Sequence, residues 1–158
     1  MNESTEALQF ENNLNKTYET SLGNEYKVEC IARESGNTED LFAVFKKVGG
    51  ETAWIKKTSD FRSADDFDGE FNEGEMETSE EVSVGQRYQH FKTKDFYIIR
   101  AIAYSRSNPK ERFVIYEGQY NSPEFGDHPI WVREFGDFTG MKIFDDGRAP
   151  VKRFDLIN

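Results

Sequence analysis

The side chains that could do chemistry in this sequence gather in its second half. His90 lies between Tyr88 and Lys92 in the segment "RYQHFK", where an imidazole could serve as a base, a ligand or a pH switch. Trp131 and Arg133 lie in "IWVRE", and Trp and Arg are favoured at binding hot spots. These residues could form a recognition patch, with the indole as an anchor and the guanidinium as a charge partner.

Aromatic side chains extend this candidate site. Three tyrosines of the second half could line an open groove that binds an extended peptide or a single nucleic-acid strand, although an aromatic core requires the same residue types. Trp54 recurs in the first half in the context of Trp131, which favours a core position for both tryptophans. The candidate binding residues are Tyr88, His90, Lys92, Tyr116, Tyr120, Trp131, Arg133 and Arg153.

No catalytic set accompanies these residues. The chain has two histidines, and its one cysteine, Cys30, lies far from both along the sequence. A zinc set with standard spacing, a glycine-rich phosphate loop and a nucleophile elbow are absent from the sequence. We therefore expect no enzymatic activity, no metal and no cofactor, and a structural or surface role for His90.

Charge limits the classes of partner. The formal net charge is -10, and residues 1–80 hold 19 acidic against 8 basic side chains, whereas residues 81–158 hold 11 against 12. Duplex binding depends on Lys and Arg displacing counterions, so this acidity disfavours nucleic-acid binding by the whole chain. The second half alone remains a candidate for single strands. The acidic half could instead occupy a basic site on another protein, as an inhibitor or nucleic-acid mimic does.

Location can be predicted from the same composition. A single cysteine excludes an intramolecular disulfide, which fits a reducing compartment. The opening "MNESTEALQF" lacks the basic region and apolar run of a signal peptide, and no stretch reaches the roughly 20 apolar residues of a membrane span. We expect a cytoplasmic protein that has no membrane contact.

Internal similarity organises the chain. "WIKKTSDF" from Trp54 and "WVREFGDF" from Trp131 share one pattern at an offset of 77. "YKVECIAR" from Tyr26 and "YIIRAIAY" from Tyr97 match at an offset of 71, so the second copy has six additional residues, around "NSPEFG". Surface loops tolerate such insertions. The chain is therefore predicted to be a tandem duplication.

The matched segments predict strands. "FYIIRAIAY" and "RFVIYEG" are rich in β-branched and aromatic residues and flank the turn-forming "SRSNPKE". Short strands with no room for a long helix predict a mainly β chain of two tandem SH3-like barrels or rolls. The predicted parts are an N-terminal segment with a possible short helix (1–15), a first repeat (16–63), an acidic linker that cannot order itself (64–81) and a second repeat (82–158).

Several ordered motifs in the second copy are specific to a family. "RYQHFK" at 87–92, "VIYEGQY" at 114–120, "IWVRE" at 130–134 and "VKRFDLI" at 151–157 resemble the bacterial domain-of-unknown-function family 1653. The resemblance covers residues 85–157 and implies a small SH3-like barrel with no assigned activity. Glu134 replaces the usual proline of the family, and the first copy lacks counterparts of His90 and Lys92.

These observations rank the functions. A non-enzymatic module that binds an unidentified protein or peptide through the second repeat is the first hypothesis. The acidic inhibitor is the alternative, and nucleic-acid binding by the second repeat is the third.

Overall fold

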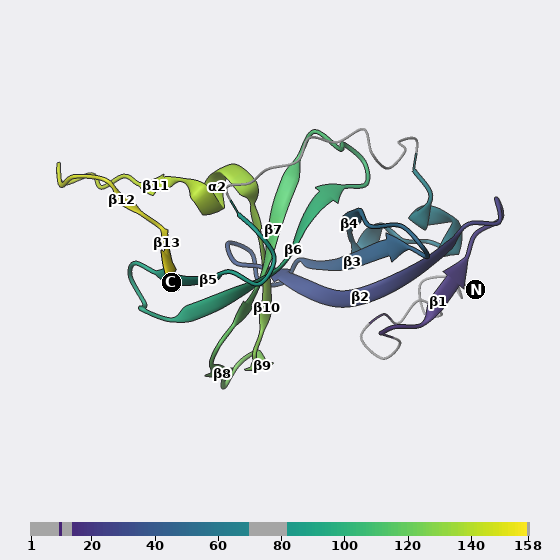
Figure 1. The fold of residues 1–158 in the computed structure, drawn as a ribbon, viewed down its shortest axis with the longest axis horizontal. Helices are drawn as coiled ribbons and strands as arrows, with labels where there is room; N and C mark the ends of the chain where they lie inside the picture. The colour runs from purple at the N-terminus through teal and green to yellow at the C-terminus, as the bar shows by residue number, and fades with distance from the viewer. Residues whose placement is uncertain (1–9, 11–13, 70–81, 158) are drawn as a thin grey trace.

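The computed structural model describes residues 10, 14–69 and 82–157, and the fold is mainly β (Figure 1). We call residues 14–69 the first half and residues 82–157 the second half. The strands of the first half are β1 (Thr17–Glu19), β2 (Glu25–Glu34), β3 (Leu41–Lys47) and β4 (Ala53–Lys57). Those of the second half are β5 (Arg87–His90), β6 (Phe96–Ser105), β7 (Arg112–Gly118), β8 (Asn121–Ser122), β9 (Gly126–Asp127), β10 (Ile130–Glu134), β11 (Met141–Lys142), β12 (Val151–Lys152) and β13 (Phe154–Ile157).

Strands of both halves pair in a single sheet. Within each half the neighbours are antiparallel, as β2–β3–β4 and as β6–β7–β10. Two parallel pairings join the halves, β4 with β6 and β10 with β2. The six strands β2, β3, β4, β6, β7 and β10 therefore form a closed cycle of pairings, and β1, β5 and β13 extend the sheet from it.

Corresponding strands of the two halves pair in the same register. Val28 faces Phe45 in the β2–β3 hairpin, and Ile99 faces Tyr116 in the β6–β7 hairpin, 71 positions later. Each long strand has an irregularity at the same point, between Val28 and Cys30 in β2 and between the equivalent residues 99 and 101 in β6. A bulge bends its strand and re-aims the side chains beyond it, so both long strands turn at the same place.

The two bends divide the interior into three clusters. One cluster, around Trp54 and Phe67, lies mainly in the first half and also takes Tyr104 of β6, and another, around Tyr116 and Phe154, lies in the second half. The central cluster takes side chains from both halves, among them Ala32 of β2 and Ala103 of β6, each 0% exposed. Small side chains there let strands of the two halves approach closely. Figure 1 shows β1 toward one end of the long axis and β5 with β13 on the opposite side of the molecule, where the β11–β12 hairpin extends farthest.

Short helical turns follow β4 in the first half and β10 in the second half, the last strand of each half in the closed cycle. They are η2 (Thr58–Asp60) and η3 (Ala64–Phe67) in the first half and α2 (Phe135–Thr139) in the second. The Ser63 side chain accepts a hydrogen bond from the Asp65 N–H at the start of η3, and Asp66 accepts one from the Ser63 N–H, which forms a capping box.

The first six residues of the predicted acidic linker are ordered. Residues 64–67 form η3, and Phe67 is 0% exposed in the cluster of the first half. The prediction that residues 64–81 cannot order themselves is therefore wrong for residues 64–69, because one buried aromatic ring anchors them. Residues 70–81 lie outside the described part of the chain, as does most of the helix predicted within residues 1–15.

The prediction of a mainly β chain is confirmed. Two separate SH3-like barrels are not confirmed, because β4–β6 and β2–β10 place both halves in one sheet. The six additional residues near "NSPEFG" form the β8–β9 hairpin, as expected of an insertion between matched strands. Within the described ranges, no helix is long and apolar enough to cross a membrane.

Candidate binding site in the second half

Strands β5, β6, β7, β10 and β13 place a group of aromatic rings at one end of the sheet. Phe154 of β13 stacks on Phe138 of α2 with ring centroids 4.2 Å apart, and its ring edge meets Tyr116 at 5.4 Å. Tyr97 meets Tyr116 at 5.2 Å. Contacts between buried aromatic rings contribute more stabilisation than their buried area alone. This cluster is therefore a well-packed base for the surface above it.

An open pocket of about 130 Å³ lies over these rings, and we call it the aromatic pocket. It is lined by Ser35, His90, Thr93, Tyr97, Tyr116, Tyr120, Trp131, Arg133 and Phe154. Ser35, which directly follows β2, is the only one of these from the first half. The parallel pairing of β2 with β10 brings it there.

Hydroxyl and indole groups connect three of the rings. The Trp131 indole N–H donates to the Tyr120 hydroxyl at 3.0 Å, and the Tyr120 and Tyr97 hydroxyls lie 3.4 Å apart. Burial, followed by the hydrogen bond with Tyr120, raises the pKa of Tyr97. The Tyr97 hydroxyl therefore stays protonated at neutral pH and can donate or accept a hydrogen bond.

Arg133 supplies the positive charge of the pocket. Its Nε–H donates to the Tyr116 hydroxyl at 3.2 Å, and Nη1 donates to Asp137 Oδ2 at 2.8 Å. Arg153 approaches the other oxygen of Asp137 at 3.5 Å. One carboxylate thus faces two guanidinium groups, and the local charge stays positive.

His90 is neutral in this pocket, where one of its ring nitrogens accepts hydrogen bonds and the other can donate one. Its Nδ1 lies 3.2 Å from the Lys92 amide and 3.5 Å from the Thr93 amide and accepts from them. Burial and the neighbouring Arg133 lower the pKa of His90. The ring proton therefore lies on Nε2, and the described residues offer the imidazole no hydrogen-bonded carboxylate of the type that orients a catalytic base.

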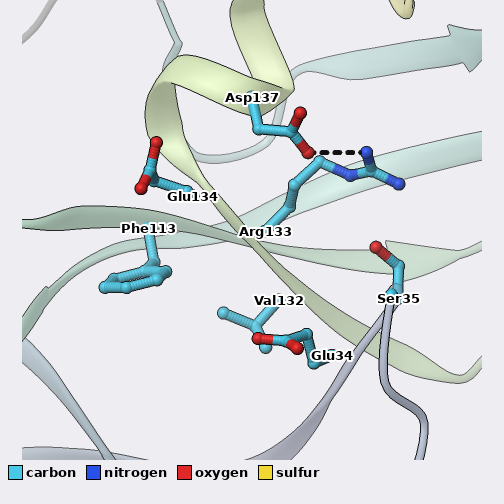
Figure 2. A pocket seen from close by; sticks show the side chains of 8 residues that line it. Glu34, Ser35, Phe113, Val132, Arg133, Glu134 and Asp137 are labelled. Carbon is cyan, nitrogen blue, oxygen red and sulfur yellow. Dashed lines mark hydrogen bonds and ion pairs between the residues drawn. The ribbon is translucent and has the colours of Figure 1, made fainter.

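A wider cleft of about 450 Å³ adjoins the pocket through shared lining residues, and we call it the polar cleft. Figure 2 shows Arg133 reaching toward Asp137 on one side and Ser35 on the other. Ser35 and Arg133 line both cavities. The polar cleft also has Glu34, Glu134 and Asp137 in its wall, so its charge is mixed, whereas no acidic side chain lines the aromatic pocket.

Five of the eight predicted binding residues line the aromatic pocket, namely His90, Tyr116, Tyr120, Trp131 and Arg133. The other three do not. Tyr88 is 6% exposed in the core, Lys92 is not among the lining residues, and Arg153 lies beside the pocket, where it binds Asp137 and the Met141 carbonyl. Sequence reasoning missed Ser35, Thr93, Tyr97 and Phe154, although the match of Tyr97 with Tyr26 was a usable signal.

The two tryptophans differ. Trp54 is 0% exposed and its indole N–H has no partner among the described residues, so it is a core residue as predicted. Trp131 is half-buried, and its ring lines the pocket. The sequence pattern shared by "WIKKTSDF" and "WVREFGDF" therefore does not distinguish a buried tryptophan from one that lines a pocket.

The equivalent place in the first half is filled by Arg106. Its guanidinium lies 4.2 Å from the ring centroid of Trp54. Nε donates to the Phe67 carbonyl at 2.9 Å, and Nη2 donates to the Tyr26 hydroxyl at 3.0 Å. Arg106 directly follows β6, just as Ser35 directly follows β2. The large side chain closes one end of the sheet, and the small one leaves the other open.

The described ranges hold no group of three or more His, Cys, Asp or Glu side chains that could bind a metal ion. Residues 86–156 match the model of a family described as "Protein of unknown function (DUF1653)". Comparisons with curated proteins and with solved structures find no match.

Proposed function

We propose that this chain is a non-enzymatic binding module whose second half holds a protein or peptide partner at the aromatic pocket. The segment that matches the family, residues 86–156, includes every lining residue of the pocket except Ser35. The site combines large aromatic rings with one positive charge, which are the side chains enriched at binding hot spots.

The two halves derive, in this proposal, from one duplicated unit of SH3-like strand order. Support comes from the register, because β2 with β3 and β6 with β7 pair identically at an offset of 71. The shared bulge position gives further support. The two parallel strand pairings between the halves are also equivalent, because β4 places Trp54 beside Tyr104 of β6 and β10 places Trp131 beside Arg33 of β2. These pairings relate the halves by approximate two-fold symmetry.

The main support for the proposed function is that equivalent positions hold different side chains, with Arg106 after β6 and Ser35 after β2. A buried guanidinium fills the end of the first half, so that end offers no room to a partner. Ser35 leaves the matching volume of the second half open. After duplication, one copy has become structural and the other has kept an accessible cavity.

Affinity capture from native lysate with full-length baits tests this proposal. The wild type is compared with Ser35→Arg, which supplies the side chain that closes the first half, and with Ser107→Arg at an exposed turn position, which is the matched control. We expect a partner that the wild type and Ser107→Arg retain and that Ser35→Arg loses. The same captured proteins with all three baits would contradict a role for the pocket.

The acidic-inhibitor alternative has less support from the described residues. Asp65 accepts hydrogen bonds from the Ser21 amide and hydroxyl, and Asp68 accepts from Asn24 and Tyr26. These carboxylates are engaged within the chain. Capture that falls steeply between low and moderate salt and is unaffected by Ser35→Arg would favour this alternative.

A further inference from the structure

The size of the aromatic pocket limits its ligand. A volume of about 130 Å³ holds roughly four water molecules, whereas sites for drug-sized molecules or cofactors occupy ~300–1,000 Å³. The pocket therefore suits one side chain or a small organic molecule.

The first half contains its own occupants at the equivalent end. Besides the Arg106 guanidinium, the Asp68 carboxylate accepts hydrogen bonds from Tyr26 at 3.0 Å and from Asn24 at 2.9 Å. Burial opposes its ionisation, but the hydrogen bonds from Asn24, Thr20 and Tyr26 outweigh burial and lower the pKa of Asp68. This end of the sheet thus accommodates a carboxylate in the first half.

The second half has the matching donors without the carboxylate. Tyr97 corresponds to Tyr26, because each pairs with the tyrosine of the preceding short strand. His90 corresponds to Thr20, since each comes two residues after that tyrosine. His90 and Tyr97 both line the aromatic pocket, and no Asp or Glu does.

Charge selects between an anion and a cation. A cation could stack on Trp131 as Arg106 stacks on Trp54, but Arg133 lines the pocket, and its nearest carboxylate already contacts two arginines. A second cation would lack a counter-charge. An anion would find Arg133, whose Nη2 has no hydrogen-bond partner within the described chain, and the neutral His90. Two guanidinium groups and one carboxylate leave a single positive charge, which matches a carboxylate better than a doubly charged phosphate.

We propose that the aromatic pocket binds a carboxylate, with Arg133 and His90 donating to its oxygens and its apolar stem packed against Trp131. The carboxylate belongs to an acidic side chain of a partner or to a small organic acid. This inference rests on the proposed function and specifies the chemistry of the same site.

NMR titration of the full-length protein tests the carboxylate directly. The two indole N–H signals separate the pocket from the core, because Trp131 lines the pocket and Trp54 is 0% exposed. Propionate is compared with propionamide, methylguanidinium and inorganic phosphate at constant ionic strength and pH. We expect saturable shifts of the Trp131 signal with propionate, at an affinity roughly tenfold or more above that of propionamide, because charge-assisted hydrogen bonds are stronger than neutral ones.

Two further arms distinguish the source of the carboxylate and localise binding. The blocked tripeptide Ac-Ala-Glu-Ala-NH2, with Ac-Ala-Gln-Ala-NH2 as its control, presents the acid as a side chain. Tripeptide binding at least as tight as propionate indicates a protein partner, and binding of propionate alone indicates a small acid. Ser35→Arg should abolish the shifts, and Ser107→Arg should leave them unchanged.

Equal response to propionate and propionamide, or saturation by methylguanidinium or phosphate instead, would overturn the carboxylate assignment. The acid and amide are compared on the wild type, so this result does not depend on a variant that folds. Loss of captured partner with Ser35→Arg, combined with no response to any carboxylate, would keep the binding module and reject only its ligand chemistry.

Discussion

Ser35 and Arg106 occupy equivalent places, 71 positions apart, each directly after the long strand of its hairpin. The Arg106 guanidinium lies 4.2 Å from the Trp54 ring centroid, whereas Ser35 lines an open pocket with Trp131. One difference in side-chain size thus separates a closed end of the sheet from an accessible one. The same relationship also makes Arg106 a structural residue, which can be measured.

Replacing Arg106 by alanine should lower the free energy of unfolding by roughly 3 kcal/mol. The change removes the stacking on Trp54 and the hydrogen bonds to Phe67 and Tyr26. Arg100→Ala is the matched control, because Arg100 forms an exposed ion pair with Glu117, which contributes at most about 1 kcal/mol. Urea denaturation of both variants checks the difference, and equal losses would show that Arg106 does not hold its end of the sheet together.

Phe67→Ala should destabilise the protein by about 3–5 kcal/mol. The Phe67 ring is 0% exposed and contacts the rings of Phe61 at 4.7 Å and Phe45 at 5.0 Å. Leu22→Ala, at a side chain that is 78% exposed, should change stability by less than about 0.5 kcal/mol. If thermal and urea unfolding of the Phe67 variant match the wild type, residues 64–69 behave as a solvated linker after all.

Neither half should fold as a stable monomer. Residues 1–81 and residues 82–158, prepared separately, would expose the edges of β2, β4, β6 and β10 that pair between the halves, and unpaired edges are prone to associate. We expect unfolded or self-associated fragments that form a one-to-one complex when they are mixed. Circular dichroism and analytical ultracentrifugation measure both properties. A cooperatively folded, monomeric 82–158 fragment would instead indicate two independent barrels.

Stability should fall below neutral pH in a manner that depends on His90. Burial and Arg133 lower the pKa of His90 in the native state, whereas the unfolded chain has an ordinary histidine pKa of about 6.5. Below that pH the unfolded state takes up a proton that the native state resists, so stability decreases as pH falls, until the native pKa is reached. His90→Gln should lose less stability than the wild type between pH 7.5 and pH 5 in urea titrations. Parallel stability curves for the two proteins would exclude this linkage.

The strands and their spacing were determined by the sequence alone, because alternation and turn chemistry act over a few residues. The segments "YKVECIAR" and "YIIRAIAY" form matching long strands, and the additional residues near "NSPEFG" form a hairpin between matched strands. The family that residues 86–156 match could also be predicted from the sequence, because its motifs are short and occur in a fixed order along the chain. Averaged composition misled the linker prediction, since nine acidic side chains in residues 64–81 outweighed the Phe67 ring, which is buried in the described part of this segment.

Only the tertiary structure decided how the two halves meet and what that does to the site. Pairing of β2 with β10 joins residues about 100 positions apart, and local pattern carries no information on such contacts because they depend on the packing of the whole sheet. That pairing brings Ser35 to Trp131 and creates the pocket, while the pairing of β4 with β6 brings Trp54 beside the strand that directly precedes Arg106. The sequence supplied the residue types, and long-range strand pairing determined which of the two tryptophans faces an open cavity.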